Sequence, residues 1–257
     1  MMPALCIIGL TKYFGALCAV NDVSIDLLPG ERRAILGPNG AGKTTLFNLI
    51  AGDFLPTHGS IHLFGEDIGK MPPHHRTRLG VSRTYQNSLL FKGLSVLENL
   101  FLSVRGVKPH RLSLLVPRSA DPHLARAREW ARQVGLAHKI DARVSELSHG
   151  EQRQLEVGMA LAGGPRLLLL DEPAAGLSQA ERPILTKMLR ELPRTITILL
   201  IEHDMDVALQ WAECVTVMHN GAAVFEGTPK EAASSPTIHA LYLGDHDRNT
   251  RSSDSRT

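Results

Sequence analysis

The pattern of apolar and polar positions predicts short strands at the start of the chain, over residues 4–8, 23–27 and 33–36. The third strand runs into a glycine-rich turn, and apolar residues at helical spacing then predict a helix over about 43–51. Another strand-like run at 60–64 precedes a turn rich in Pro and His at 72–75.

The middle of the chain has helical periodicity. Helices are predicted near 96–104 and 124–134, and a loop over 105–122 with three prolines separates them. We interpret residues 89–147 as a helical subdomain inserted into a sheet domain.

Strands and helices alternate in the last part of the chain. The predicted helices are 151–162, 181–191 and 205–211, and the predicted strands are 167–170, 195–201, 215–219 and 223–226. Nearly continuous Leu/Ile strands between helices indicate an α/β fold with a mostly parallel sheet that is covered on both faces. One domain is expected over 4–244, followed by a polar, disordered tail at 245–257.

Composition excludes several classes of protein. The 257 residues carry a formal net charge of +2, and no basic run supports nucleic-acid binding. The longest aliphatic runs are far shorter than the roughly 20 residues of a membrane-spanning helix, and no signal peptide is apparent. Three scattered cysteines indicate reduced thiols in the cytosol rather than a disulfide framework or a metal site.

A phosphate-binding loop is predicted between the strand at 33–36 and the helix that follows. Its glycines let successive N–H groups point at anionic oxygens, Lys43 would neutralise the β- and γ-phosphates, and Thr44 would be a Mg²⁺ ligand. Thr45 adds a donor at the first turn. A chance glycine-rich turn is the alternative, and the strand–loop–helix context argues against it. The pattern G-x-x-x-x-G-K-[ST] is met by Gly37, Pro38, Asn39, Gly40, Ala41, Gly42, Lys43 and Thr44.

Two adjacent carboxylates follow the leucine strand at 167–170. Acids also gather at strand ends simply because chains exit to water there. Beside a phosphate-binding loop, however, Asp171 suits the Mg²⁺ shell, and Glu172 suits polarising the water that attacks the γ-phosphorus.

The segment Leu147-Ser148-His149-Gly150-Glu151-Gln152 opens the helix before that strand. With the two sites above, it resembles the signature of the ABC transporter ATPases, a resemblance that covers residues 5–244. It implies a P-loop ATPase core with an N-terminal antiparallel β-subdomain, ATP and Mg²⁺ as ligands, and a head-to-tail dimer of cassettes.

In such a dimer, Ser148 and Gly150 would contact the γ-phosphate of ATP held by the other cassette. Ser148-x-x-Glu151 is also a capping box, and the two roles are compatible. His149 stands where the family usually has Gly.

Three further positions match the family. Gln86 resembles the glutamine that senses Mg²⁺ and links the site to the membrane partner, and His203 resembles the histidine that bonds the γ-phosphate. Phe14 resembles the aromatic residue that stacks on adenine, with Tyr13 as a rival. Ser178, at the end of the loop after the carboxylates, is interpreted as a helix cap without a catalytic part.

Four further segments resemble the sequences of the ATPases for uptake of branched-chain (hydrophobic) amino acids, and the urea/amide branch of that family is close by. The segments are 83–87, 171–176, 201–205 and 241–244. The resemblance implies an importer with two transmembrane permease subunits and an external solute-binding protein. The chain would be cytoplasmic, on the inner face of the membrane. Apolar residues at 89–96 would receive a permease helix or simply pack in the core.

Other classes remain as alternatives. The same four segments resemble the lipopolysaccharide-export ATPases to a lesser degree. A soluble ABC protein of repair or translation usually has two cassettes or long insertions, and a nucleotide sensor would not need intact Lys43, Asp171, Glu172 and His203. The sequence names neither the solute nor whether the partner cassette is a copy of this chain.

Overall fold

The structure, a computed structural model, describes residues 2–84, 90–106, 121–203, 205–238 and 240–241. It divides into two compact units. Unit 1 comprises Met1–Pro72 and Thr197–Thr257, and unit 2 comprises Pro73–Ile196. Each unit is described by itself.

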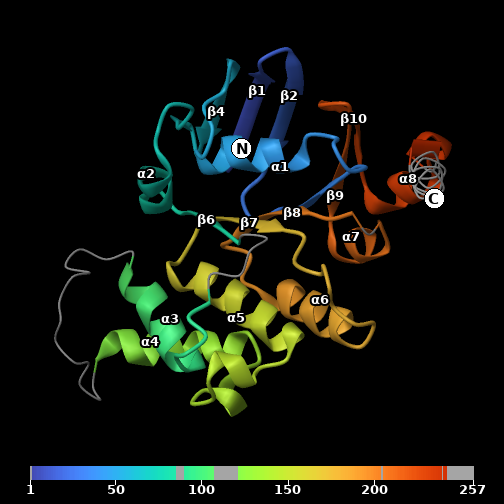
Figure 1. The fold of residues 1–257 in the computed structure, drawn as a ribbon. Coiled ribbons are helices and arrows are strands. Elements are labelled where there is room, and N and C mark those ends of the chain that lie inside the picture. The colour runs from blue at the N-terminus through green and yellow to red at the C-terminus, as the bar shows by residue number, and fades with distance from the viewer. Residues whose placement is uncertain (1, 85–89, 107–120, 204, 239, 242–257) are drawn as a thin grey trace, which may run out of the picture. The chain divides into compact units, whose positions relative to one another are not determined.

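Unit 1 begins with an antiparallel sheet in the order β2-β1-β4-β5. Its strands are β1 (Leu5–Phe14), β2 (Leu17–Leu27), β4 (His58–Leu63) and β5 (Glu66–Asp67). Figure 1 shows β1, β2 and β4 side by side. β1 and β2 run well beyond the predicted 4–8 and 23–27, because irregular registers carry the pairing through stretches without clean alternation.

The second sheet of unit 1 is built on β3 (Arg32–Leu36), which pairs in parallel with β8 (Thr197–Ile201) and β9 (Cys214–His219). Every residue of β3 and β8 is buried, as expected for parallel strands covered on both faces. β10 (Ala222–Gly227) adds an antiparallel edge.

Three helices accompany these strands: α1 (Lys43–Ala51), α7 (Met205–Trp211) and α8 (Pro229–Ser234). Residues of α7 and α8 pack with β3 and β9 in one apolar cluster that includes Leu36 and Val217.

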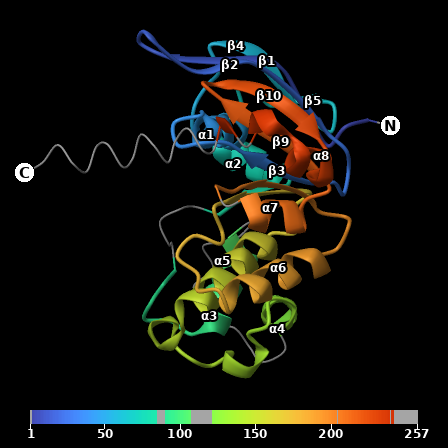
Figure 2. The ribbon, with the colours of Figure 1, turned by 90° about the vertical axis from the view of Figure 1, so that its right-hand side faces the viewer.

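Unit 2 combines a short parallel pair, β6 (Val81–Arg83) and β7 (Leu167–Asp171), with a group of helices. Figure 2 shows α3, α4 and α5 packed together. Gly158 permits this closeness, because a Cβ there would lie 3.1 Å from a Leu100 methyl group. The helices are α2 (Pro73–Arg78), α3 (Val96–Gly106), α4 (Pro122–Gln133), α5 (His149–Ala162) and α6 (Glu181–Glu191), with 3-10 turns η1 (Ala137–Lys139) and η2 (Val144–Glu146).

The predicted α/β class is confirmed, with one local correction. The turn predicted at 72–75 is wrong, because the chain there forms the helix α2 from Pro73. Proline is compatible with the first helical position, where an N–H has no partner within the helix. The tail predicted at 245–257 lies outside the described residues, and the boundaries 89–147 of the helical subdomain stay a prediction.

Within the described part of the chain, no helix is both long enough and apolar enough to cross a membrane.

The segment before α3 splits into core and surface positions. Leu90 and Val96 are buried, whereas 53% of Phe91 is exposed. Asn99, fully buried, holds the Phe91 backbone: its Oδ1 accepts from the Phe91 N–H at 2.9 Å, and its Nδ2 donates to the carbonyls of Phe91 and Ser95 at 3.2 and 2.9 Å. The buried side-chain amide of Asn99 therefore fixes the backbone position of the exposed Phe91.

We predict that Asn99→Ala lowers the free energy of unfolding of unit 2 by about 2–3 kcal/mol, because it leaves buried backbone groups of the Phe91 segment without partners. Trp130 is in unit 2 and Trp211 in unit 1, so urea titration followed by tryptophan fluorescence in a Trp211→Phe background reports on unit 2. Asn21→Ala, at an exposed position of unit 1, is the control and should change little.

Candidate functional site

The glycine-rich loop joins β3 to α1 in unit 1. Lys43, the first residue of α1, is buried, and its Nζ donates to the carbonyl oxygens of Gly37 at 2.6 Å and Pro38 at 2.9 Å. A positive charge is thereby held inside the loop, at the start of α1, where the first N–H groups of the helix also attract anions.

The two outer glycines of the loop are required by their surroundings. A Cβ on Gly37 would lie 2.2 Å from the carbonyl oxygen of Met218, and one on Gly42 would lie 2.3 Å from that of Ala19. Both glycines have positive φ, at 151° and 97°. The loop can therefore lie against β9 and β2 only because these positions lack side chains.

The remaining loop positions differ in exposure. Asn39, Gly40 and Thr44 are exposed, and Ala41 is buried. Pro38 and Thr45 are intermediate. The Thr44 hydroxyl lies in the first turn of α1, where the predicted metal-ligand role requires it to be accessible.

The two candidate aromatics at the end of β1 are both partly exposed, Phe14 by 42% and Tyr13 by 44%. Phe14 packs edge-to-face on Phe54 with ring centroids 5.2 Å apart, and Lys12 Nζ lies 5.0 Å from the Phe14 centroid. These contacts favour one orientation of the Phe14 ring.

His203 follows β8, also in unit 1. Its side chain is 53% exposed, and its Nδ1 lies 4.0 Å from Oε2 of the buried Glu202.

The carboxylate pair lies at the end of β7 in unit 2. Asp171 is 1% exposed, and its Oδ2 accepts from Arg83 Nη2 at 2.9 Å. Its Oδ1 is also buried and has no hydrogen-bond partner among the described residues. A buried carboxylate oxygen in this state is suited to a further cation.

Glu172 has a left-handed backbone, with φ of 46°, which is uncommon for a residue with a Cβ. Its carbonyl accepts from the Ala175 N–H at 3.0 Å, so the strand ends in a tight turn here. Backbone strain of this kind concentrates at functional positions.

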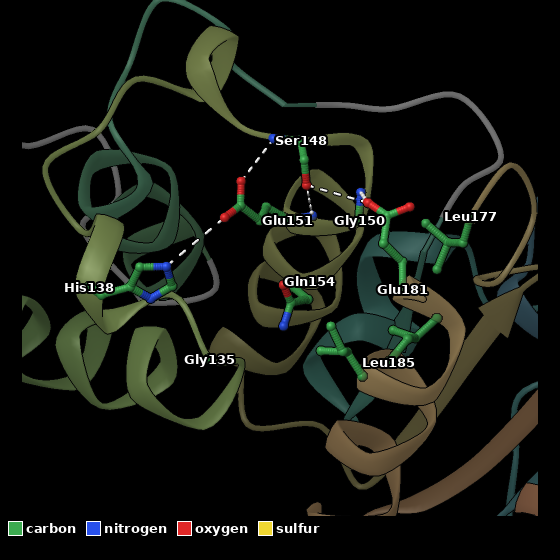
Figure 3. Close-up of a pocket in the computed structure, with 10 residues that line it drawn as sticks. Gly135, His138, Ser148, Gly150, Glu151, Gln154, Leu177, Glu181 and Leu185 are labelled. Atoms are coloured by element: carbon green, nitrogen blue, oxygen red, sulfur yellow. Dashed lines mark hydrogen bonds and ion pairs between the residues drawn. The ribbon is translucent and has the colours of Figure 1, made fainter. Parts of the chain in front are cut away.

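The segment at the start of α5 forms the predicted capping box (Figure 3). Ser148 Oγ accepts from the Glu151 N–H at 3.2 Å, and the Ser148 N–H donates to Glu151 Oε2 at 2.8 Å. Burial raises the pKa of Glu151, but hydrogen bonds from Lys139 and Ser148 outweigh it, so the pKa is lowered. The signature helix therefore has a fixed, ionised start.

Two neighbours complete this region. Glu181, from α6, accepts from the Gly150 N–H at 3.0 Å (Figure 3). The His149 ring lies against Gly176, because a Cβ on that glycine would be 2.8 Å from His149 Nε2. The His at the unusual signature position thus packs on the loop after the carboxylate pair.

Residues 20–175 match the family model described as ABC transporter. The chain belongs to the ABC transporter family. It is 37% identical over 251 residues to the high-affinity branched-chain amino acid transport ATP-binding protein LivG of Escherichia coli K12, covering 95% of this chain and 98% of LivG. The protein BraF of Pseudomonas aeruginosa, with the same description, is 38% identical over equal shares.

Among solved structures, the ADP conformation of an ATP-binding cassette of an ABC transporter matches with a TM-score of 0.86 and 31% identity. The match covers 95% of this chain and all of that one. The predicted family and the P-loop cassette fold are thereby confirmed.

The structure of this ABC cassette gives each unit part of the predicted site. Unit 1 holds the loop, Phe14 and His203, and unit 2 holds Asp171, Glu172 and the signature segment. Gln86 lies outside the described residues. Among the described residues no group of three or more His, Cys, Asp and Glu side chains forms a metal cluster.

The ion pair of Arg83 with Asp171 was not predicted from the sequence. Arg83 ends β6, and its contact with Asp171 spans 88 positions, so no local pattern reveals it. Thr84 adds to the link, because its Oγ1 accepts from the Asp171 N–H at 3.3 Å.

We predict that Arg83→Met lowers the free energy of unfolding of unit 2 by about 3–5 kcal/mol, because it leaves the Asp171 charge buried without its partner. Trp130 fluorescence in urea, with Trp211→Phe as background, measures the loss.

The matched control is the double variant Arg83→Met with Asp171→Asn. Removing both charges should restore roughly half or more of the lost stability. Simple additivity of the two single changes would show that the ion pair is not the source of the effect.

Proposed function

We propose that this chain is the ATP-hydrolysing subunit of an ABC importer for branched-chain or other hydrophobic amino acids, or related amides. It would act on the cytoplasmic face of the inner membrane, bound to permease subunits. The observation that carries the proposal is the 37% identity to LivG, a branched-chain amino acid transport ATP-binding protein, along nearly the whole of both chains. Lipopolysaccharide export is the alternative to be tested.

ATP binding is assigned to the loop of unit 1. The backbone N–H groups of 37–44, except at Pro38, which has none, and those at the start of α1 would surround the β- and γ-phosphates, and Lys43 would offset their charge. Phe14 would stack on adenine through its partly exposed ring, with Tyr13 as the rival.

The residues present fit Mg²⁺. This ion prefers few protein oxygens together with phosphate oxygens, and it neutralises charge that develops on the phosphates. Thr44 Oγ1, Gln86 and Asp171 Oδ1 would hold it; of these, Asp171 Oδ1 is the buried oxygen without a partner among the described residues.

Hydrolysis is assigned to three side chains. Glu172 would accept a proton from the attacking water, and His203 would donate to the γ-phosphate, with Gln86 completing the arrangement. Ser148 and Gly150 would donate to the γ-phosphate held by a second cassette, a copy of this chain or a paralogue. Two ATP molecules would thus join two cassettes, and hydrolysis would release them, which moves the two permease subunits.

We predict that Glu172→Gln reduces the rate of phosphate release by about 10²–10⁴-fold, because the amide cannot accept the proton of the attacking water. ATP affinity, measured by calorimetry with Mg²⁺, should stay within a few-fold of the unchanged chain. Glu66→Gln, on the exposed strand β5, is the control and should hydrolyse normally. Full turnover by the Glu172 variant would remove this residue as the base.

The partners are tested by purifying the tagged chain from its native membranes in mild detergent. Two permease subunits and a second cassette would support the importer. Components of lipopolysaccharide export would overturn the direction, and recovery alone or with nucleic-acid or ribosomal proteins would favour a soluble ABC protein.

We predict that Phe91→Ala lowers permease recovery several-fold while ATP binding is unchanged, since the exposed ring offers apolar contact area in the part of the chain that follows Gln86. Leu17→Ala removes another exposed apolar side chain, on β2, and is the control. Equal permease recovery with both variants would place the coupling surface elsewhere.

A further inference from the structure

Glu181 lies at the place where the proposed function needs a phosphate. Its Oε1 accepts from the Gly150 N–H at 3.0 Å and from the Ser148 hydroxyl at 3.4 Å. These are the two groups assigned to the γ-phosphate of the partner's ATP. Figure 3 shows the carboxylate directed at the start of the signature helix.

The contact is closely fitted. A Cβ on Gly150 would lie 2.6 Å from Glu181 Oε1, so the carboxylate approaches the helix only because this position is glycine. The other oxygen, Oε2, accepts from the Ser178 N–H at 3.0 Å and from the Ser178 hydroxyl at 2.8 Å. Glu181 lies 31 positions after Gly150 in the chain, and its side chain thus connects the start of α5 with the segment before α6.

The charge state suits an anion site. The Ser178 N–H and hydroxyl, and then the Gly150 N–H, lower the pKa of Glu181. The side chain is therefore an anion at neutral pH, as a γ-phosphate is. Two anions cannot share the same N–H and hydroxyl donors without strong repulsion.

Space for a movement exists beside the contact. A cavity of about 270 Å³ is lined by Glu181 together with Ser148, Gly150, Leu177 and Leu185. A rotation about the side-chain bonds of Glu181 would place its carboxylate there while α6 stays in position.

We propose that Glu181 is an internal stand-in for the γ-phosphate, which closes the signature site of the separate cassette and must be displaced when ATP joins two cassettes. This inference rests on the proposed function. Breaking the Glu181 contact costs part of the free energy of ATP-driven association. The closed dimer therefore forms at a higher ATP concentration than the phosphate contacts alone would require.

The experiment measures dimer formation by sedimentation velocity during titration of the full chain with ATP and Mg²⁺, in a Glu172→Gln background that slows hydrolysis. Adding Glu181→Gln removes the competing charge and should lower the ATP concentration at half-dimerisation by about tenfold. Glu181→Asp keeps the charge near Ser178 but is one methylene shorter, so it should shift the midpoint in the same direction.

The chain itself offers a matched control. Glu231 makes the same capping contacts with the N–H and hydroxyl of Thr228, at 2.7 and 2.8 Å, at the start of α8 in unit 1. Glu231→Gln therefore removes the charge from an equivalent contact that is not part of the signature segment, and should leave the midpoint unchanged.

The outcomes separate the two proposals. An unchanged or raised midpoint with Glu181→Gln and Glu181→Asp, while the parent dimerises, would overturn the role of Glu181 and leave it a helix cap. A parent that neither binds ATP, measured by calorimetry, nor dimerises would overturn the proposed function itself. Thermal denaturation of all variants shows whether the two Glu181 changes affect folding more than Glu231→Gln does.

Discussion

An ionised side chain loses several kcal/mol of hydration when it is buried, and the protein must supply partners in exchange. This constraint governs both units. In unit 1, Lys43 is buried at the start of α1, and carbonyl oxygens of its own loop surround it. In unit 2, Asp171 is buried at the end of β7, and Arg83 satisfies one of its two oxygens. For Asp171, the oxygen that Arg83 leaves without a partner among the described residues is the one assigned to the metal ion.

The same reasoning explains why the ends of helices carry so much of the proposed site. A helix start presents N–H groups that need an acceptor, and here the acceptors are carboxylates: Glu151 and Glu181 at α5, and Glu231 at α8. At α8 the acceptor has a structural use alone. At α5, Glu181 accepts hydrogen bonds from the Ser148 and Gly150 donors that the proposed reaction assigns to the γ-phosphate. The carboxylate and the phosphate therefore compete for the same donors.

The elements that could be predicted were those with a strong local signal. β7 and β8 are nearly continuous apolar runs, and α5 begins at the capping box of Ser148. The helix cap predicted at Ser178 is wrong, because α6 begins after Ala180, which makes no side-chain capping bond. The short elements β6 and α8 were not predicted, because three to six residues carry too little periodicity. The helix at Pro73 was taken for a turn, since proline is compatible with both and the choice depends on residues further along.

The sequence by itself determined the family, the phosphate-binding loop and the order of the candidate residues along the chain, because each of these is a short run with its own chemistry. It did not determine that Arg83 pairs with Asp171, that Gly37 faces the Met218 carbonyl or that Glu181 bonds Gly150. Those contacts join residues 31 to 181 positions apart, and they exist only once strands and helices have become neighbours. Packing decides which polar group meets which, and therefore only the tertiary structure showed which donors of the signature helix are already in use.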